Sequence, residues 1–82
     1  MKTSEVITGL QTLKPHYKDE DGYHVGADHD TIYAYQTDTP LSPDEVATML
    51  ENHWFQLDHE GMNERDMEPG DYRPDENWTA YV

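Results

Sequence analysis

Carboxylates are the groups in this 82-residue sequence whose number and spacing indicate a function. The chain has 18 Asp and Glu against five Lys and Arg, a formal net charge of −13. Eight of the carboxylates fall within 19 residues: Asp58, Glu60, Glu64, Asp66, Glu68, Asp71, Asp75 and Glu76. Three others lie on a predicted helix before them: Asp44, Glu45 and Glu51. Carboxylates form charge-assisted hydrogen bonds with Lys and Arg, so this distribution predicts recognition of a basic partner.

The density of these charges is comparable to that of a nucleic acid. Size scaling makes a compact domain of this length roughly 30 Å across, and duplex DNA of that length carries about 18 phosphate charges. Such a protein could occupy a cationic groove built for DNA or RNA. The alternative is a solvated surface that only keeps the protein soluble. The same charge argues against direct binding to nucleic acid or to an anionic membrane, since both require clustered cations.

Histidines close to carboxylates suggest a metal site, but their spacing argues against one. His24 and His29 flank a turn that contains Asp28 and Asp30, and this spacing matches no zinc motif. An acidic turn that begins at Asp19 lacks the bidentate Glu at the last position of a calcium loop. We therefore expect ordinary surface or half-buried histidines, no metal and no other cofactor.

The remaining reactive residues do not indicate catalysis. The only serines, Ser4 and Ser42, are better explained as helix caps, and the absence of cysteine excludes disulfides and thiolate chemistry. Carboxylate pairs are so abundant that no single pair is informative. We therefore expect a protein that is not an enzyme. Because the sequence has no secretory stretch and no apolar run long enough to span a membrane, we expect a cytoplasmic location.

The first element that could position these groups is a helix near the N-terminus. Its apolar residues repeat at helical spacing: Val6, Ile7, Leu10 and Leu13. Thr3 or Ser4 can cap this helix, and Pro15 ends it near residue 14. Gly9 weakens it by about 1 kcal/mol relative to Ala.

Two short strands and a second helix follow. Residues 23–25 and 31–35 predict strands joined by a turn at residues 26–30. The second helix has a complete start, in which Ser42 is the cap, Pro43 takes the first helical position and Glu45 closes a capping box. We expect this helix to run to about Asn52.

The last part of the chain predicts two further strands around a long loop. Residues 54–57 are dense in aromatic side chains and favour a strand, and residues 78–82 alternate as a terminal strand. Between them lies a polar, acidic loop of about 20 residues at 58–77. The order α-β-β-α-β-β predicts a single α+β domain over residues 1–82, with two helices on one face of a small four-stranded antiparallel sheet.

Such a sheet leaves its second face uncovered. Tyr33 and Tyr35 alternate with apolar residues along one predicted strand and share that face, and Tyr81 could join them. An exposed aromatic patch suits a dimer or target interface. This supports an alternative function, a dimeric structural or regulatory interaction module.

Three segments resemble small acidic proteins of bacteriophages and prophages: GYHVGADHDTIYA at 22–34, LSPDE at 41–45 and WTAYV at 78–82. Such proteins include inhibitors of host defence, among them anti-CRISPR and anti-restriction proteins, several of which imitate DNA. Together with the charge, the resemblance implies a non-catalytic inhibitor of a host protein that has a basic nucleic-acid-binding groove. It implies the host cytoplasm as location, and it does not extend to the loop at 58–77.

Overall fold

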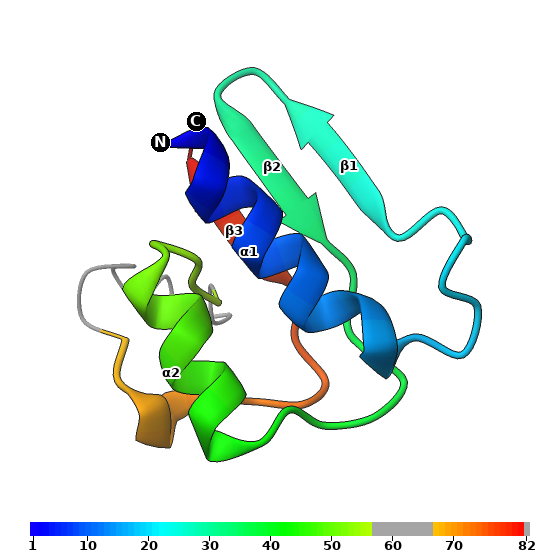
Figure 1. The fold of residues 1–82 in the computed structure, drawn as a ribbon, viewed down its shortest axis with the longest axis vertical. Coiled ribbons are helices and arrows are strands. Elements are labelled where there is room, and N and C mark those ends of the chain that lie inside the picture. The colour runs from blue at the N-terminus through cyan, green and yellow to red at the C-terminus, as the bar shows by residue number, and fades with distance from the viewer. Residues whose placement is uncertain (57–66, 82) are drawn as a thin grey trace.

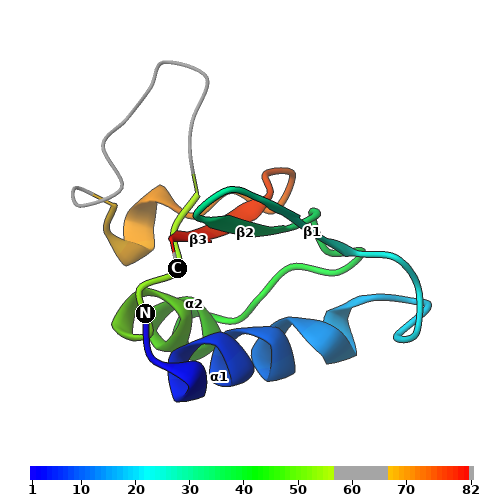
Figure 2. The same cartoon turned by 90° about the horizontal axis from the view of Figure 1, so that it is seen from above.

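The computed structural model describes residues 1–56 and 67–81, which form a helical layer and a sheet layer (Figure 2). The elements are, in chain order, α1 (Thr3–Leu13), η1 (Lys14–His16), β1 (Val25–Asp28), β2 (Thr31–Ala34), α2 (Pro43–Glu51), η3 (Pro69–Asp71) and β3 (Trp78–Tyr81). Both α-helices lie on the same face of the sheet (Figure 2). The predicted α+β fold, with two helices on one face of an antiparallel sheet, is confirmed in this form.

The sheet has its three strands in the order β1-β2-β3 (Figure 1). Between β2 and β3, Ala34 pairs with Trp78 and Ile32 pairs with Ala80. Side chains of directly paired residues share one face of a sheet, and Ala34, Trp78 and Ala80 are buried in the core with residues of both helices. Tyr33 lies between these positions and therefore belongs to the opposite face.

The prediction of a fourth strand at residues 54–57 is wrong within the described residues. Phe55 alone forms a bridge with Thr79, through two backbone hydrogen bonds of 2.9 and 2.7 Å. Before the bridge, the Trp54 N–H still donates to a carbonyl of α2. After it, the Gln56 N–H donates to the sulfur of Met67 at 3.1 Å. The pairing is therefore limited to one residue, and residue 57 lies outside the described part.

The β1–β2 hairpin has a shifted first strand, a second strand one residue shorter and a tighter turn than predicted. β1 begins at Val25, and the expected turn at residues 26–30 contracts to two residues, with His29 at a φ of 52°. Gly26 lies inside the strand, where an added Cβ would be closer than 3.0 Å to the ring of Tyr33. This glycine meets a packing requirement, which the local pattern of the sequence does not distinguish from a turn.

The two helices differ in how well their starts were predicted. The capping box of α2 is confirmed, because the Ser42 hydroxyl accepts from the Glu45 N–H at 3.2 Å and Glu45 Oε1 accepts from the Ser42 N–H at 2.9 Å. Helix α1 has Lys2 as its cap instead of residue 3 or 4. The Lys2 N–H donates to the Glu5 carboxylate at 2.8 Å. A side chain from within the helix thus supplies the hydrogen-bond partner of the N-cap backbone group.

Trp54 connects the two helices. Its side chain is 1% exposed, and its Nε1–H donates to the Glu5 carbonyl of α1 at 3.0 Å. The indole lies against Gly9, where an added Cβ would be closer than 3.0 Å to three of its atoms. The residue predicted to weaken α1 is therefore the point at which the helix admits a large aromatic ring.

The described part of the predicted long loop, residues 67–77, is anchored by side chains. The Tyr72 hydroxyl accepts from the Leu41 N–H at 2.9 Å. The Gln56 amide bonds both backbone groups of Arg73, with Nε2 donating to the carbonyl at 2.8 Å and Oε1 accepting from the N–H at 2.9 Å. Met67 is buried in the core. The remaining loop residues, 58–66, lie outside the described part of the chain.

Candidate functional site

The carboxylates predicted to bind a partner fall into three groups in the structure. Five are exposed: Asp44, Glu51, Glu68, Asp71 and Asp75. Two are half-buried: Glu45 and Glu76. Four lie outside the described residues, so their role stays a prediction: Asp58, Glu60, Glu64 and Asp66.

Exposed carboxylates lie at the start of α2, in and next to η3, and in the turn that follows η3. The α2–η3 acidic surface is defined by four residues: Asp44, Glu68, Asp71 and Asp75. Here η3 packs beside α2 (Figure 1), and the hydrogen bond from Leu41 to Tyr72 joins the segment before α2 to the segment after η3. The fold therefore brings the segment that begins α2 into contact with the acidic segment around η3, whereas Glu51 lies at the other end of α2.

The carboxylates of this surface are not neutralised by basic side chains within the described residues. Apart from Glu76, no carboxylate of residues 1–56 and 67–81 forms an ion pair with Lys or Arg. The ion pairs that do occur there use histidine: His16–Glu45 at 2.7 Å, His53–Glu5 at 3.0 Å and His29–Asp28 at 3.8 Å. The charge of the α2–η3 acidic surface thus faces solvent.

Glu45 has a structural role that distinguishes it from the other predicted carboxylates. Its Oε1 accepts the Ser42 N–H, and its Oε2 lies 2.7 Å from His16 Nε2. Burial opposes ionisation, but the hydrogen bonds from Ser42 and His16 outweigh it and hold the pKa of Glu45 below its ordinary value. Because both oxygens have partners inside the protein, Glu45 joins η1 to α2 and is poorly placed to contact another molecule.

The predicted aromatic residues lie on the sheet face opposite the helices. The rings of Tyr33 and Tyr35 meet edge to face at 6.0 Å, and Phe55 packs against Tyr81 at 5.2 Å. Tyr35 is 47% exposed and Tyr81 is 48% exposed, whereas Phe55 and Thr79 are buried. The aromatic surface is therefore not continuous, because the exposed rings of Tyr35 and Tyr81 alternate with the buried side chains of Phe55 and Thr79.

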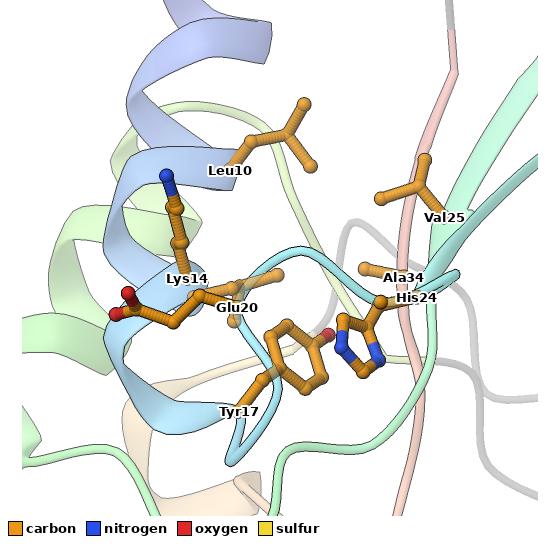
Figure 3. A pocket seen from close by; sticks show the side chains of 9 residues that line it. Leu10, Lys14, Tyr17, Glu20, His24, Val25 and Ala34 are labelled. Carbon is orange, nitrogen blue, oxygen red and sulfur yellow. The ribbon is translucent and has the colours of Figure 1, made fainter.

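A pocket that the sequence analysis did not predict lies between α1 and the sheet (Figure 3). Its volume is about 160 Å³. Leu10 of α1 and Val25 and Ala34 of the strands form apolar walls, and the stacked rings of Tyr17 and His24, 3.9 Å apart, close one end. Helix α1, the segment before β1 and the strands β1 and β2 all contribute to this pocket, so no single motif in the sequence could have revealed it.

Tyr17 fixes the position of this aromatic stack. Its hydroxyl donates to the Tyr35 carbonyl at 2.6 Å. Burial, together with the negative charge of Asp38, raises the pKa of Tyr17 to about 12. The phenol therefore stays neutral and keeps donating its hydrogen bond at physiological pH.

Neither a cluster of metal-ligating side chains nor a membrane-spanning helix occurs among the described residues. There, no three His, Asp or Glu side chains come together in a group that could hold a metal ion. The described helices are too short or too polar to cross a membrane.

Comparisons with protein-family models, curated proteins and solved structures find no match to this chain. No activity, ligand or partner is therefore transferred from a relative.

Proposed function

We propose that this protein is a non-catalytic inhibitor that occupies the nucleic-acid-binding groove of a basic partner protein. The observation that supports the proposal is the α2–η3 acidic surface, whose exposed carboxylates have no Lys or Arg partner among the described residues: Asp44, Glu68, Asp71 and Asp75. Unneutralised carboxylates attract Lys and Arg, and the attraction is strongest in a groove already lined with cations.

The size of the protein agrees with this proposal. Its principal extents are 31 × 27 × 23 Å. Duplex DNA of the longest of these lengths carries about 18 phosphate charges, and the chain has 18 Asp and Glu. The whole chain thus carries about as many carboxylates as a duplex of that length carries phosphates, and those of the α2–η3 acidic surface are the part that would face the groove. Association would be fast and would slow as ionic strength rises.

The resemblance to small acidic phage proteins extends the proposal to a class of partner. We propose a bacterial defence protein that handles nucleic acid, which would make the chain an anti-CRISPR or anti-restriction inhibitor. CRISPR effectors hold their nucleic acids in a positively charged channel, which is the kind of groove that this acidic surface suits. Such an inhibitor would act in the cytoplasm of the host cell.

The experiment that tests the proposal compares two charge-reversal variants of the tagged full-length protein. One reverses charges of the α2–η3 acidic surface: Asp44→Lys and Glu68→Lys. Its control makes the same change of charge at two exposed carboxylates elsewhere: Asp38→Lys and Glu51→Lys. A protein retained from a bacterial lysate is identified by mass spectrometry, and its affinity for each variant is then measured.

The two variants have different expected outcomes because their net charges are equal and only the positions differ. Two reversals at about 1 kcal/mol each predict about 30-fold weaker binding for the α2–η3 variant. The control should lose less than about tenfold, through the change in overall field alone. Circular dichroism verifies that both variants remain folded. Equal losses in the two variants would contradict binding through this surface.

A second candidate function is a dimeric structural or regulatory module that uses the aromatic sheet face. The half-exposed rings of Tyr35 and Tyr81 favour it. Light scattering at low and high salt tests it, because an apolar interface survives screening whereas charge-driven binding weakens. This function predicts a dimer at both salt concentrations and a weaker dimer for Tyr81→Ala. A monomer under all conditions would exclude it.

A further inference from the structure

The outer edge of β1 offers unused backbone hydrogen-bonding groups. β1 is at the end of the sheet order, and no described residue pairs with its outer side (Figure 1). The His24 carbonyl accepts from the Tyr35 N–H at 2.8 Å, and bonded pairs alternate along an antiparallel ladder, so Gly26 is the next residue bonded to β2. The N–H and C=O groups of Val25 and Ala27 therefore point away from β2. An edge of this kind is a template for another strand.

The pocket between α1 and the sheet lies beside this edge. Val25 lines the pocket and is 51% exposed, and β1 lies to the side of both helices (Figure 1). An apolar cavity of about 150 Å³ can hold a benzene molecule, so a pocket of about 160 Å³ accommodates one apolar side chain. In a strand paired to β1, alternate side chains would point to the same face as Val25, towards the pocket.

Carboxylates flank the edge and the pocket at both ends. All are exposed, three in the turn before β1 and two at the hairpin tip: Asp19, Glu20, Asp21, Asp28 and Asp30. Glu20 also lines the pocket, on the same side as Lys14 (Figure 3). These charges attract a segment with Lys or Arg at its ends. They repel a second copy of this chain, which would bring its own carboxylates to the same positions.

We propose that the β1 edge and the adjoining pocket bind an extended segment of a partner protein, with alternating apolar residues and Lys or Arg at both ends. The segment adds a strand to β1 through the outward groups of Val25 and Ala27. One of its apolar side chains fills the pocket, and its basic ends pair with the flanking carboxylates. This binding mode is separate from the α2–η3 acidic surface and does not depend on the proposed function.

Amide hydrogen exchange of the full-length protein, followed by NMR, tests this mode directly. The probe is a synthetic peptide of about ten residues that alternates Leu or Val with Thr and has two Lys at each end. At a peptide concentration of 100 times Kd, the Val25 and Ala27 amide protons should exchange about 100-fold more slowly. The Gly26 amide, already bonded to β2, should change little.

Two single variants test the backbone and the pocket separately. Ala27→Pro removes an outward N–H at an edge position, where proline is tolerated. Leu10→Trp replaces a side chain that lines the pocket with a larger aromatic one that fills it. Each should weaken peptide binding by about tenfold or more, the effect of losing roughly 1.4 kcal/mol of contact. Because the variants alter different features, the proposal can still be tested if one of them fails to fold.

A matched pair of charge variants tests the flanking carboxylates. Asp21→Asn with Asp28→Asn should weaken binding and reduce its salt dependence. Asp44→Asn with Asp75→Asn makes the same change of charge on the α2–η3 acidic surface and should have little effect. The opposite ranking would overturn the proposal while leaving the proposed function intact.

Three further results would overturn the inference. The first is equal binding of a peptide with Glu in place of Lys. The second is protection of amides on α2 or β3 in place of Val25 and Ala27. The third is slow exchange at Val25 and Ala27 without peptide that increases with protein concentration, because a second copy would then occupy the edge.

Discussion

Gly9→Ala is the substitution whose effect on stability the structure defines most sharply. In a helix considered alone, Ala is favoured over Gly by about 1 kcal/mol, so the sequence of α1 predicts stabilisation. In the folded protein, however, the new Cβ would lie closer than 3.0 Å to three atoms of the Trp54 indole. Gly9 is itself buried, so either the indole or the helix must move.

The cost of this movement exceeds the gain in helix propensity. Overpacking a core site destabilises a protein by about 1–3 kcal/mol. Displacement of the Trp54 indole also breaks its 3.0 Å hydrogen bond to the Glu5 carbonyl, which adds about 1 kcal/mol. After subtraction of the helix-propensity gain of about 1 kcal/mol, we expect Gly9→Ala to lower the free energy of unfolding by about 1–3 kcal/mol.

Urea denaturation followed by circular dichroism measures this effect in a double-mutant cycle with Trp54→Phe. The smaller ring removes the clash, so Gly9→Ala should cost less than about 0.5 kcal/mol in the Trp54→Phe background. Gly70→Ala is the control, because a Cβ at Gly70 meets nothing within 4 Å. Stabilisation by Gly9→Ala, or an equal cost in both backgrounds, would refute the packing argument.

Three further substitutions test side chains that hold separate segments together. Since the pKa of Tyr17 is raised to about 12, its contribution to stability is complete below about pH 10 and is lost between about pH 10 and 12. Tyr17→Phe should therefore lower the free energy of unfolding by about 1 kcal/mol at neutral pH, and the variant should lose less stability than the wild type as the pH rises above about 10. Parallel pH profiles of stability for the two proteins would contradict this. Because the pKa of Glu45 is lowered, Glu45→Gln should lower the free energy of unfolding by about 1 kcal/mol at neutral pH. The difference in stability from the wild type should shrink as acid protonates the wild-type carboxylate. A difference that stays constant in thermal melts at acid pH would refute this prediction. Gln56→Leu should lower stability by about 2–4 kcal/mol in thermal denaturation, because it leaves both backbone groups of Arg73 without their amide partner; a loss below about 0.5 kcal/mol would argue against that role.

The features predicted correctly from the sequence are those that neighbouring residues determine. The start of α2 is an example, because Ser42 and Glu45 satisfy each other's backbone groups without help from the rest of the chain. The alternation that places Tyr33 and Tyr35 on one face follows likewise from the geometry of a strand. Two helices and an antiparallel sheet then leave few ways to bury the apolar residues.

The features that sequence analysis missed depend on contacts between distant segments. Residues 54–57 have the composition of a strand, but Trp54 enters the core and the Gln56 N–H bonds to Met67. Gly9 and Gly26 were interpreted as a weak helix position and a turn, whereas each faces an aromatic ring from elsewhere in the chain. The pattern of neighbouring residues does not show that an aromatic ring from a distant segment packs against either glycine.

The candidate site likewise combines features that the sequence predicts with features that depend on contacts between distant segments. Exposure of the predicted carboxylates could be anticipated from their charge, whereas the internal role of Glu45 could not, because His16 reaches it from another segment. The pocket beside β1 was also invisible in the sequence, since it requires α1, the turn before β1 and two strands to meet.

Competition with DNA shows whether the protein occupies the nucleic-acid-binding groove of its partner. The partner retained by the full-length protein is bound to a labelled DNA or RNA ligand, and unlabelled protein is added at constant ionic strength. Occupation of the nucleic-acid groove predicts displacement of the ligand, together with an equal reciprocal effect of the ligand on protein binding. A ternary complex of partner, nucleic acid and protein, with both affinities unchanged, would contradict the account.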